Sequence, residues 1–264
     1  MDPAYPLTGR ATRYYSRTMR LASIGASDVG RKRVHNEDSF LVMPESGLFC
    51  VADGLGGHAS GEVASQLAIE EMAAFFRATD SNPADGAHED RLAEAIRLAN
   101  LSILTRARAE PDLTGMGTTL VAGYFAEDGP LVVGHVGDSR AYLFRGGELK
   151  RLTEDHSLLQ DFIRQSSPSA AEIDAFPHKN VIVRAVGMRE AVEMDLSRVK
   201  IREGDVLLLC SDGLFGMLPD EQMAEILREE GFDILRANQL LVDAANEAGG
   251  SDNVTSILVQ VVEA

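Results

Sequence analysis

The chain has 264 residues, of which 45% are hydrophobic, and a formal net charge of −16 at pH 7. This length can bury the core of one large domain or of two small ones. The negative charge argues against nucleic acid or an anionic membrane as the main partner, and no apolar run approaches the roughly 18 residues of a membrane-spanning helix. The two cysteines, Cys50 and Cys210, lie in apolar runs, which indicates buried thiols and favours a reducing, cytoplasmic setting.

Residues 1–18 differ in composition from the rest of the chain. Three arginines stand against a single acid, prolines and a glycine interrupt any helix, and there is no apolar stretch of the kind found in a secretory signal. We expect a flexible N-terminal extension over residues 1–18 and one folded domain over residues 19–264.

Apolar patterning from residue 20 onward predicts strands and helices in alternating groups. Short apolar runs predict strands at 20–26, 39–43, 48–52, 115–125, 131–137, 140–145, 181–186, 194–201, 205–211 and 254–262. Apolar residues at helical spacing predict helices at 60–78, 88–109, 157–165, 219–229 and 232–248. This order of strands, two helices, strands, two helices and a last strand indicates an α+β fold with mainly antiparallel sheet.

The predicted strand 48–52 stops at a carboxylate, Asp53, and three glycines follow within four residues. Two interpretations are open for this stretch alone. The pattern G-x-G-x-x-A from Gly54 to Ala59 fits a dinucleotide-binding loop, and Asp53 fits a metal ligand. Against the first, Asp53 would point a negative charge at a pyrophosphate. The second acid that a dinucleotide-binding fold requires would also fall in the turn-rich segment 80–86.

Three further aspartates lie at strand ends beside glycines. Asp138 and Asp212 each follow a predicted strand, and Asp252 precedes the last one. A single aspartate in such a place is usually an ordinary turn former, but four of them predict a shared site. Carboxylates that converge in a pocket of low dielectric need cations to stay charged, and hard oxygen ligands favour Mg²⁺ or Mn²⁺.

An arginine stands close to these acids in the sequence. Arg33 lies four residues before Glu37, which is followed at once by Asp38. A guanidinium beside metal-binding acids can hold two phosphate oxygens through parallel hydrogen bonds. The residues therefore point to a metal site that binds a phosphate group.

Seven spaced motifs together resemble the metal-dependent, type-2C protein serine/threonine phosphatases, and the compact bacterial members most. In chain order they are Arg33-x-x-Asn36-Glu37-Asp38, Asp53-Gly54-x-Gly56-Gly57-His58, Gly115-Met116-Gly117-Thr118-Thr119, Gly137-Asp138-Ser139-Arg140, Thr153-x-Asp155-His156-Ser157, Ser211-Asp212-Gly213 and Asp252-Asn253-Val254-Thr255. The resemblance runs from about residue 20 to the C-terminus. It implies a four-layer αββα sandwich, in which two antiparallel sheets pack face to face with a helix pair outside each.

The resemblance also implies a dinuclear metal site at one end of the sheets. Asp53 would bridge both ions, and the Gly54 carbonyl would hold one of them. Asp212 and Asp252 would complete the other ion's site, and Glu37 would hold a metal-bound water.

Further roles follow from the same resemblance. Asp138 and Asp212 would form a third, weaker metal site, Arg33 would bind the substrate phosphate, and residues 157–187 would form a flap beside the site.

The implied reaction is hydrolysis of phosphoserine and phosphothreonine monoesters. Two Mn²⁺ or Mg²⁺ ions would clamp the phosphate and activate a bridging hydroxide for in-line attack, and no covalent intermediate is expected. Arg33, Asp53 and Asp212 would be the catalytic residues. A cysteine-nucleophile phosphatase needs an arginine six residues after the cysteine, and those positions hold Gly56 and Gly216.

One departure concerns the proton donor for the leaving group. In animal members of the family that this chain resembles, a histidine stands directly after the Asp-Gly pair. This chain has Leu55 at that position, as is typical of bacterial members. We interpret His58, His135 and His156 as structural residues and expect metal-bound water to donate the proton.

Two alternatives differ in function. A non-catalytic pseudophosphatase is disfavoured because Asp53, Asp212 and Asp252 are all present, and a phosphomonoesterase for nucleotides or small molecules stays open. As partners we expect phosphoprotein substrates and an opposing serine/threonine kinase in signal transduction. We expect no nucleic acid, no membrane insertion and a monomer.

Overall fold

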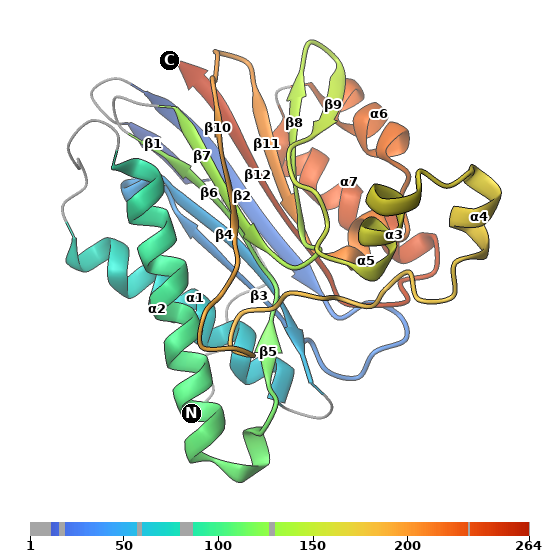
Figure 1. Ribbon diagram of the computed structural model, residues 1–264. Coiled ribbons are helices and arrows are strands. Elements are labelled where there is room, and N and C mark those ends of the chain that lie inside the picture. The colour runs from blue at the N-terminus through green and yellow to red at the C-terminus, as the bar shows by residue number, and fades with distance from the viewer. Residues whose placement is uncertain are drawn as a thin grey trace.

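The computed structural model describes residues 12–15, 19–56, 60–79, 87–126, 130–231 and 233–263. Two antiparallel sheets lie at its centre (Figure 1). Sheet A has the strand order β1 (Thr12–Tyr15), β2 (Arg20–Asp28), β12 (Val254–Glu263), β11 (Val206–Cys210), β8 (Arg140–Arg145) and β9 (Glu148–Arg151). Sheet B has the order β10 (Asp195–Val199), β7 (Leu131–Val136), β6 (Leu120–Phe125), β4 (Leu48–Leu55) and β3 (Asp38–Met43), and the short β5 (Gly117–Thr118) pairs with β4.

Helices cover the outer face of each sheet. α1 (Ser60–Ala78) and α2 (His88–Ala109) pack on sheet B, and α6 (Asp220–Glu230) and α7 (Ile234–Glu247) pack on sheet A (Figure 1). A single turn, α5 (Asp212–Phe215), follows β11, and α3 (Leu158–Ser166) and α4 (Ala170–Ala175) lie between β9 and β10. Short 3-10 turns occupy Pro44–Ser46 and Pro111–Leu113.

The alternation of side chains along β4 explains why four layers form. Leu48 and Cys50 point to the helix side and belong to the apolar cluster that α1 and α2 complete. Phe49 and Val51 point the other way and pack between the sheets against residues of β11 and β12 such as Leu207 and Ile257. Because both faces are buried, the strand reads as a continuous apolar run. The four-layer αββα sandwich expected from the resemblance is therefore confirmed.

The segment between β9 and β10 differs from its sequence-based prediction. Residues 181–186 form no strand but make two isolated bridges, Ser157 with Ile182 and Thr118 with Val186. The prediction of a strand there was wrong because only single residues of this segment pair: Val186 with the last residue of the two-residue strand β5, and Ile182 with Ser157 outside any strand. The helix α4 was not predicted, although its start carries a capping box in which Ser169 and Glu172 bond each other's backbone N–H groups.

The N-terminal region adds one element to sheet A. Residues 12–15, which fall within the expected flexible extension, form β1 and pair with β2 from Thr12 opposite Ser23 to Tyr15 opposite Arg20. Among the described residues, no helix is both long and apolar enough to cross a membrane.

Candidate functional site

Sheet topology brings the predicted aspartates of sheet A together. Asp212 lies two residues after the end of β11, with Ser211 between them. Asp252 lies just before β12. Because β11 and β12 are antiparallel neighbours with Cys210 opposite Ser256, the end of one strand and the start of the other meet at the same end of the sheet.

The aspartates of sheet B lie at the same end of the sandwich as Asp212 and Asp252. Asp53 stands near the end of β4, directly opposite Asp38 at the start of β3. Asp138 follows β7 and precedes Ser139, whose hydroxyl oxygen lies 2.7 Å from that of Thr119. The Thr119 hydroxyl in turn accepts a hydrogen bond from the Asp53 N–H at 3.0 Å. Asp53 and Asp138 are thus held around one threonine.

Asp38 joins the two sheets, a role that its sequence pattern did not indicate. Its Oδ2 accepts hydrogen bonds from the hydroxyls of Ser211, at 2.7 Å, directly after β11, and Thr255, at 2.6 Å, on β12 of sheet A. Burial raises the pKa of Asp38 to about 7, although these two hydrogen bonds oppose the shift. Asp38 is therefore a partly buried acid that fixes the strand ends bearing Asp53 and Asp212 against each other.

The acids raise one another's pKa values. Burial raises the pKa of Asp53 well above its usual range, and the carboxylates of Asp38, Asp212, Asp138 and Asp252 raise it further. Burial and the Asp252 carboxylate likewise raise the pKa of Asp212, which shares a hydrogen bond with Asp53. With the strand pairings above, these effects place the sequence-predicted acids near one another at the same end of the two sheets.

Glu37 and Gly54 lie side by side at the edge of this cluster. The Gly54 N–H donates to the Glu37 backbone carbonyl at 3.1 Å, and a Cβ at Gly54 would lie 2.2 Å from the Gly61 carbonyl oxygen. Only glycine allows this close approach of three backbone segments. Burial raises the pKa of Glu37, whereas the Arg33 guanidinium lowers it.

Arg33 reaches the cluster from the loop between β2 and β3. Its Nη2 donates to Asp252 Oδ2 at 2.7 Å, and about half of its side chain is exposed. A guanidinium carries five N–H donors, so further donors remain for another anion.

Comparison with known proteins identifies the family. The family model described as Protein phosphatase 2C matches residues 25–247. This chain belongs to the protein phosphatase 2C family. It is 39% identical over 237 residues to "Serine/threonine phosphatase stp" of Listeria monocytogenes, which covers 89% of this chain and 93% of that protein. It is 40% identical over 246 residues to "Serine/threonine protein phosphatase PstP" of Mycobacterium tuberculosis, covering 93% of this chain and 46% of that protein.

Solved structures agree with the family assignment. The crystal structure of the Mycobacterium tuberculosis phosphatase PstP/Ppp superposes with a TM-score of 0.82 at 38% identity, covering 91% of this chain and 98% of that one. A structure of the PstP catalytic domain in complex with two manganese ions superposes with a TM-score of 0.79 at 36% identity, covering 92% of this chain and 99% of that one.

The residues of this phosphatase 2C chain fit bound metal ions. Asp138 is buried, yet its Oδ1 has no hydrogen-bond partner among the described residues, and burial together with the Asp212 carboxylate raises its pKa to about 7. A buried acceptor without a donor next to further carboxylates is a suitable ligand for a hard cation. The donor set is made of oxygen atoms, which suits Mg²⁺ or Mn²⁺.

The backbone around Asp53 is fixed by the threonine motif at residues 117–119. The Thr118 hydroxyl donates to the Asp53 carbonyl at 2.8 Å, and the Thr119 N–H donates to the same carbonyl at 2.9 Å. The sequence did not indicate these contacts, although both threonines belong to one of the motifs that resemble the phosphatase family. They hold Asp53 in one orientation.

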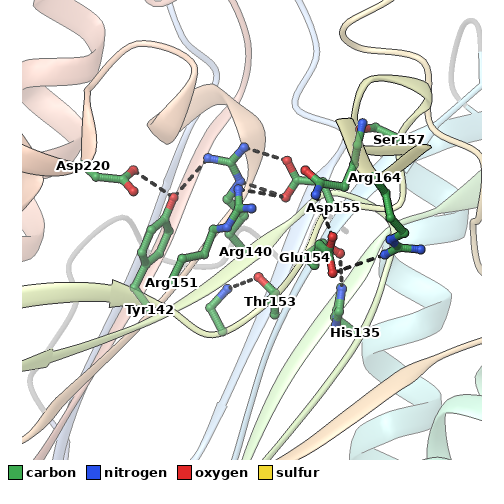
Figure 2. Close-up of polar contacts among 12 residues, drawn as sticks. His135, Arg140, Tyr142, Arg151, Thr153, Glu154, Asp155, Ser157, Arg164 and Asp220 are labelled. Atoms are coloured by element: carbon green, nitrogen blue, oxygen red, sulfur yellow. Dashed lines mark hydrogen bonds and ion pairs between the residues drawn. The ribbon is translucent and has the colours of Figure 1, made fainter. Parts of the chain in front are cut away.

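An arginine network supports the loop beside Asp138 (Figure 2). Arg140 makes a bidentate pair with Asp155, with distances of 2.9 and 2.6 Å, and its Nη1 donates to Tyr142 Oη at 3.1 Å. The Tyr142 hydroxyl donates to Asp220 on α6. Figure 2 shows Arg140 lying between Tyr142 and Asp155, so one guanidinium connects the 153–157 loop to sheet A.

Two of the histidines interpreted as structural, His135 and His156, pack against each other. His135 stacks on His156 with ring centroids 4.5 Å apart, and the Gly137 N–H donates to His156 Nδ1 at 3.1 Å. With Asp195 they form a compact group of possible ligands. Arg184 Nη1 lies 3.1 Å from His156 Nε2 and 3.2 Å from Asp195 Oδ1, so a guanidinium already provides the positive charge there. His58 lies outside the described residues.

Proposed function

We propose that this chain is a metal-dependent protein serine/threonine phosphatase, which hydrolyses phosphoserine and phosphothreonine monoesters without a covalent intermediate. The observation that carries the proposal is the convergence of Asp53, Asp212 and Asp252 at one end of the sandwich, because bound cations would neutralise the mutual repulsion of these partly buried carboxylates. The family membership and the two-manganese complex of a relative support it.

The proposed metal ligands are the residues predicted from the sequence. Asp53 would bridge two ions with the Gly54 carbonyl on one side, while Asp212 and Asp252 would hold the other and Glu37 would act through water. A third ion would be held by Asp138 and Asp212, and the lack of a hydrogen-bond partner for Asp138 Oδ1 among the described residues supports this assignment. Divalent ions bound here supply Lewis-acid stabilisation of phosphate oxygens and activation of water.

The chain's own residues orient the substrate. Arg33 would bind phosphate oxygens with the donors that Asp252 does not use, since a guanidinium can donate to two oxygens of one phosphate. Asp38 and Thr119 would hold the acids in place, and Leu55 leaves no acid side chain directly after the Asp-Gly pair, so water is the expected proton donor. Residues 157–187 would act as a flap.

Phosphoproteins are the proposed substrates because the relatives are named serine/threonine phosphatases. The proposal includes signal transduction against a serine/threonine kinase, a cytoplasmic location consistent with two free, buried cysteines, and a monomer built on a single domain from residue 19. A phosphomonoesterase for small molecules is the alternative.

Hydrolysis assays test the proposal directly. We expect Mn²⁺- or Mg²⁺-dependent turnover of p-nitrophenyl phosphate and of phosphothreonine peptides, and loss of both activities in EDTA. Asp53→Ala and Asp212→Asn should each lower kcat severely, whereas Asp243→Asn, on the exposed face of α7, serves as a matched control that should behave like the wild type. Full activity in chelator, or in either of the first two variants, would rule out a metal mechanism at this site.

A further inference from the structure

The loop of residues 29–37 between β2 and β3 carries three consecutive basic residues beside the carboxylate cluster. We propose that two of them, Arg31 and Lys32, form a subsite for a second anionic group on the substrate. That group is an acidic side chain or a second phosphate close in sequence to the phosphorylated residue. The inference rests on the phosphatase function proposed above and concerns which phosphoproteins the site selects.

The backbone of this loop is tied to the segment that holds Asp252. The Arg31 N–H donates to the Gly250 carbonyl at 2.7 Å. Asn253 Nδ2 donates to the carbonyls of Val29, at 3.0 Å, and His35, at 2.9 Å, and so holds both sides of the loop. The loop therefore stays at a fixed place beside the site, projecting from the end of the sheets (Figure 1).

Gly30 makes this seating possible. It has a φ of +82°, and a Cβ on it would lie 2.1 Å from the Asp252 carbonyl oxygen. A residue with a side chain would push the loop off the Asp252 segment, so close contact between the loop and the site is part of the fold.

The side chains of residues 31–35 are all exposed. Arg33 pairs with Asp252, but within the part of the chain that the structure describes, no ion pair joins Arg31 or Lys32 to an acid. Val34, in the same loop, is 85% exposed, which leaves the loop surface open to a ligand. In a chain of net charge −16, an acidic substrate is repelled overall, and two uncommitted cations next to the site counter that repulsion locally.

The spacing suits a neighbouring residue of the same substrate. Consecutive Cα atoms lie about 3.8 Å apart, so the Cα atoms of Arg31 and Lys32 lie within about 7.6 Å of that of Arg33. An extended peptide advances about 3.3–3.6 Å per residue. Long side chains at 31 and 32 can therefore meet an anion within about three positions of the phosphorylated residue. Guanidinium and ammonium groups bind either carboxylate or phosphate.

The test compares three phosphothreonine peptides of equal length under saturating Mn²⁺. One has neutral flanks, one has acidic residues within three positions, and one has a second phosphothreonine there. We expect the wild type to prefer both anionic peptides, and the variant R31A/K32A to lose about two- to thirtyfold of that preference in kcat/KM, since each of two exposed ion pairs contributes about 1.4- to fivefold. Added salt should reduce the preference of the wild type. The ratio between the two anionic peptides distinguishes a carboxylate from a phosphate as the preferred group.

The substitution Lys32→Glu tests the subsite, and Lys200→Glu is its matched control. Lys200 is also exposed, but it follows the end of β10 that pairs with Leu131, at the opposite end of sheet B from Asp138. Lys32→Glu should reverse the preference, and Lys200→Glu should leave it unchanged. Equal effects of both substitutions would assign the preference to the overall charge and overturn the subsite, as would a wild type that does not distinguish the peptides. If the wild type fails to hydrolyse p-nitrophenyl phosphate, it is the phosphatase function that fails.

Discussion

Asp252 accepts a hydrogen bond from Arg33, so a proposed metal ligand and the proposed phosphate-binding residue are paired with each other in this structure. A cation on Asp252 would compete with the guanidinium for the same carboxylate. Arg33 is half exposed and can turn toward a phosphate without breaking a packed core. A substitution of Arg33 alone can therefore distinguish phosphate binding by Arg33 from metal binding by Asp252.

Substituting Arg33→Ala should lower kcat/KM roughly ten- to a hundredfold while Mn²⁺ affinity stays equal or rises slightly. The loss follows from the removal of a charged hydrogen-bond donor to phosphate, worth about 1.5–3 kcal/mol. Affinity should not fall because the variant removes a competitor for Asp252. Steady-state kinetics at saturating Mn²⁺ and titration calorimetry give the two quantities, and Arg33→Lys, which keeps the charge without the planar fork, should lie between. A collapse of Mn²⁺ affinity would make Arg33 a structural residue instead.

Asp38 shows what the sequence could not reveal about single residues. Its place after Glu37 was visible, but its partners, Ser211 and Thr255, lie 173 and 217 positions away and on the other sheet. Strand-end aspartates beside glycines could be recognised because each carries its own local pattern. A residue whose role depends on long-range pairing of two sheets has no such pattern.

Among the secondary-structure elements, the 153–157 loop and the strands around it depend on Arg140. This guanidinium pairs with Asp155, donates to Tyr142 and lies 3.6 Å from the centroid of the Phe215 ring. The side chains of Arg140 and Asp155 are only 18% and 13% exposed, so water screens the pair little. One residue thus links β8, α5 and the loop beside Asp138.

Arg140→Ala should destabilise the protein by about 1–3 kcal/mol, because it removes the bidentate pair and leaves Asp155 only the longer contact with Arg151, at 3.7 Å. Urea denaturation in EDTA measures this without any contribution from metal binding. Arg106→Ala is the control, since Arg106 pairs with Glu110 on the surface of α2 with both side chains about half exposed, and it should cost much less. Similar losses for the two variants would mean that the Arg140 network contributes no more than a surface pair.

Elements that bury both faces or one clear face were predictable, as was α3, whereas α4 and the isolated bridges of residues 181–186 were not. β4 appears as one apolar run because the sheets and helices bury it on both sides, and α1 and α2 appear through their apolar faces. Residues 181–186 contain similar apolar residues but make only isolated bridges, since each bridge joins a single residue to a partner and no ladder continues from it. Local pattern reports the preference of a segment, whereas a ladder needs a partner whose position only the tertiary fold determines.

For the molecule as a whole, the acid cluster opposes folding unless protons or cations neutralise it. Burial raises the pKa of Asp38 and Asp138 to about 7, whereas in the unfolded chain these groups titrate near 3.8. Between these pH values the metal-free folded protein holds protons that the unfolded chain has released. The stability from this difference is fully present below about pH 4 and is lost as the pH rises to about 7.

Mn²⁺ should therefore raise the melting temperature more at pH 7.5 than at pH 5.5. At about 100 times Kd, binding to the folded state alone adds roughly 2.7 kcal/mol, or about 5–10 °C for a chain of this size. At pH 5.5 protons compete for the same carboxylates and the rise should shrink. His135 and His156, whose pKa values burial lowers, titrate in the opposite sense but affect melting with and without Mn²⁺ alike, because neither is a proposed ligand.

The Asp53→Asn variant tests two properties of the cluster, its binding of metal and the mutual repulsion of its acids. The variant removes a bridging carboxylate, so Mn²⁺ should no longer raise its melting temperature at either pH. In EDTA at pH 7.5 it should nevertheless melt at or above the wild type, because one repelling charge has gone from the cluster. Scanning calorimetry of both proteins with and without Mn²⁺ gives all the required values. If the wild type melts at the same temperature in EDTA and in millimolar Mn²⁺ at pH 7.5, the carboxylates do not act as one site, and the proposed chemistry fails with them.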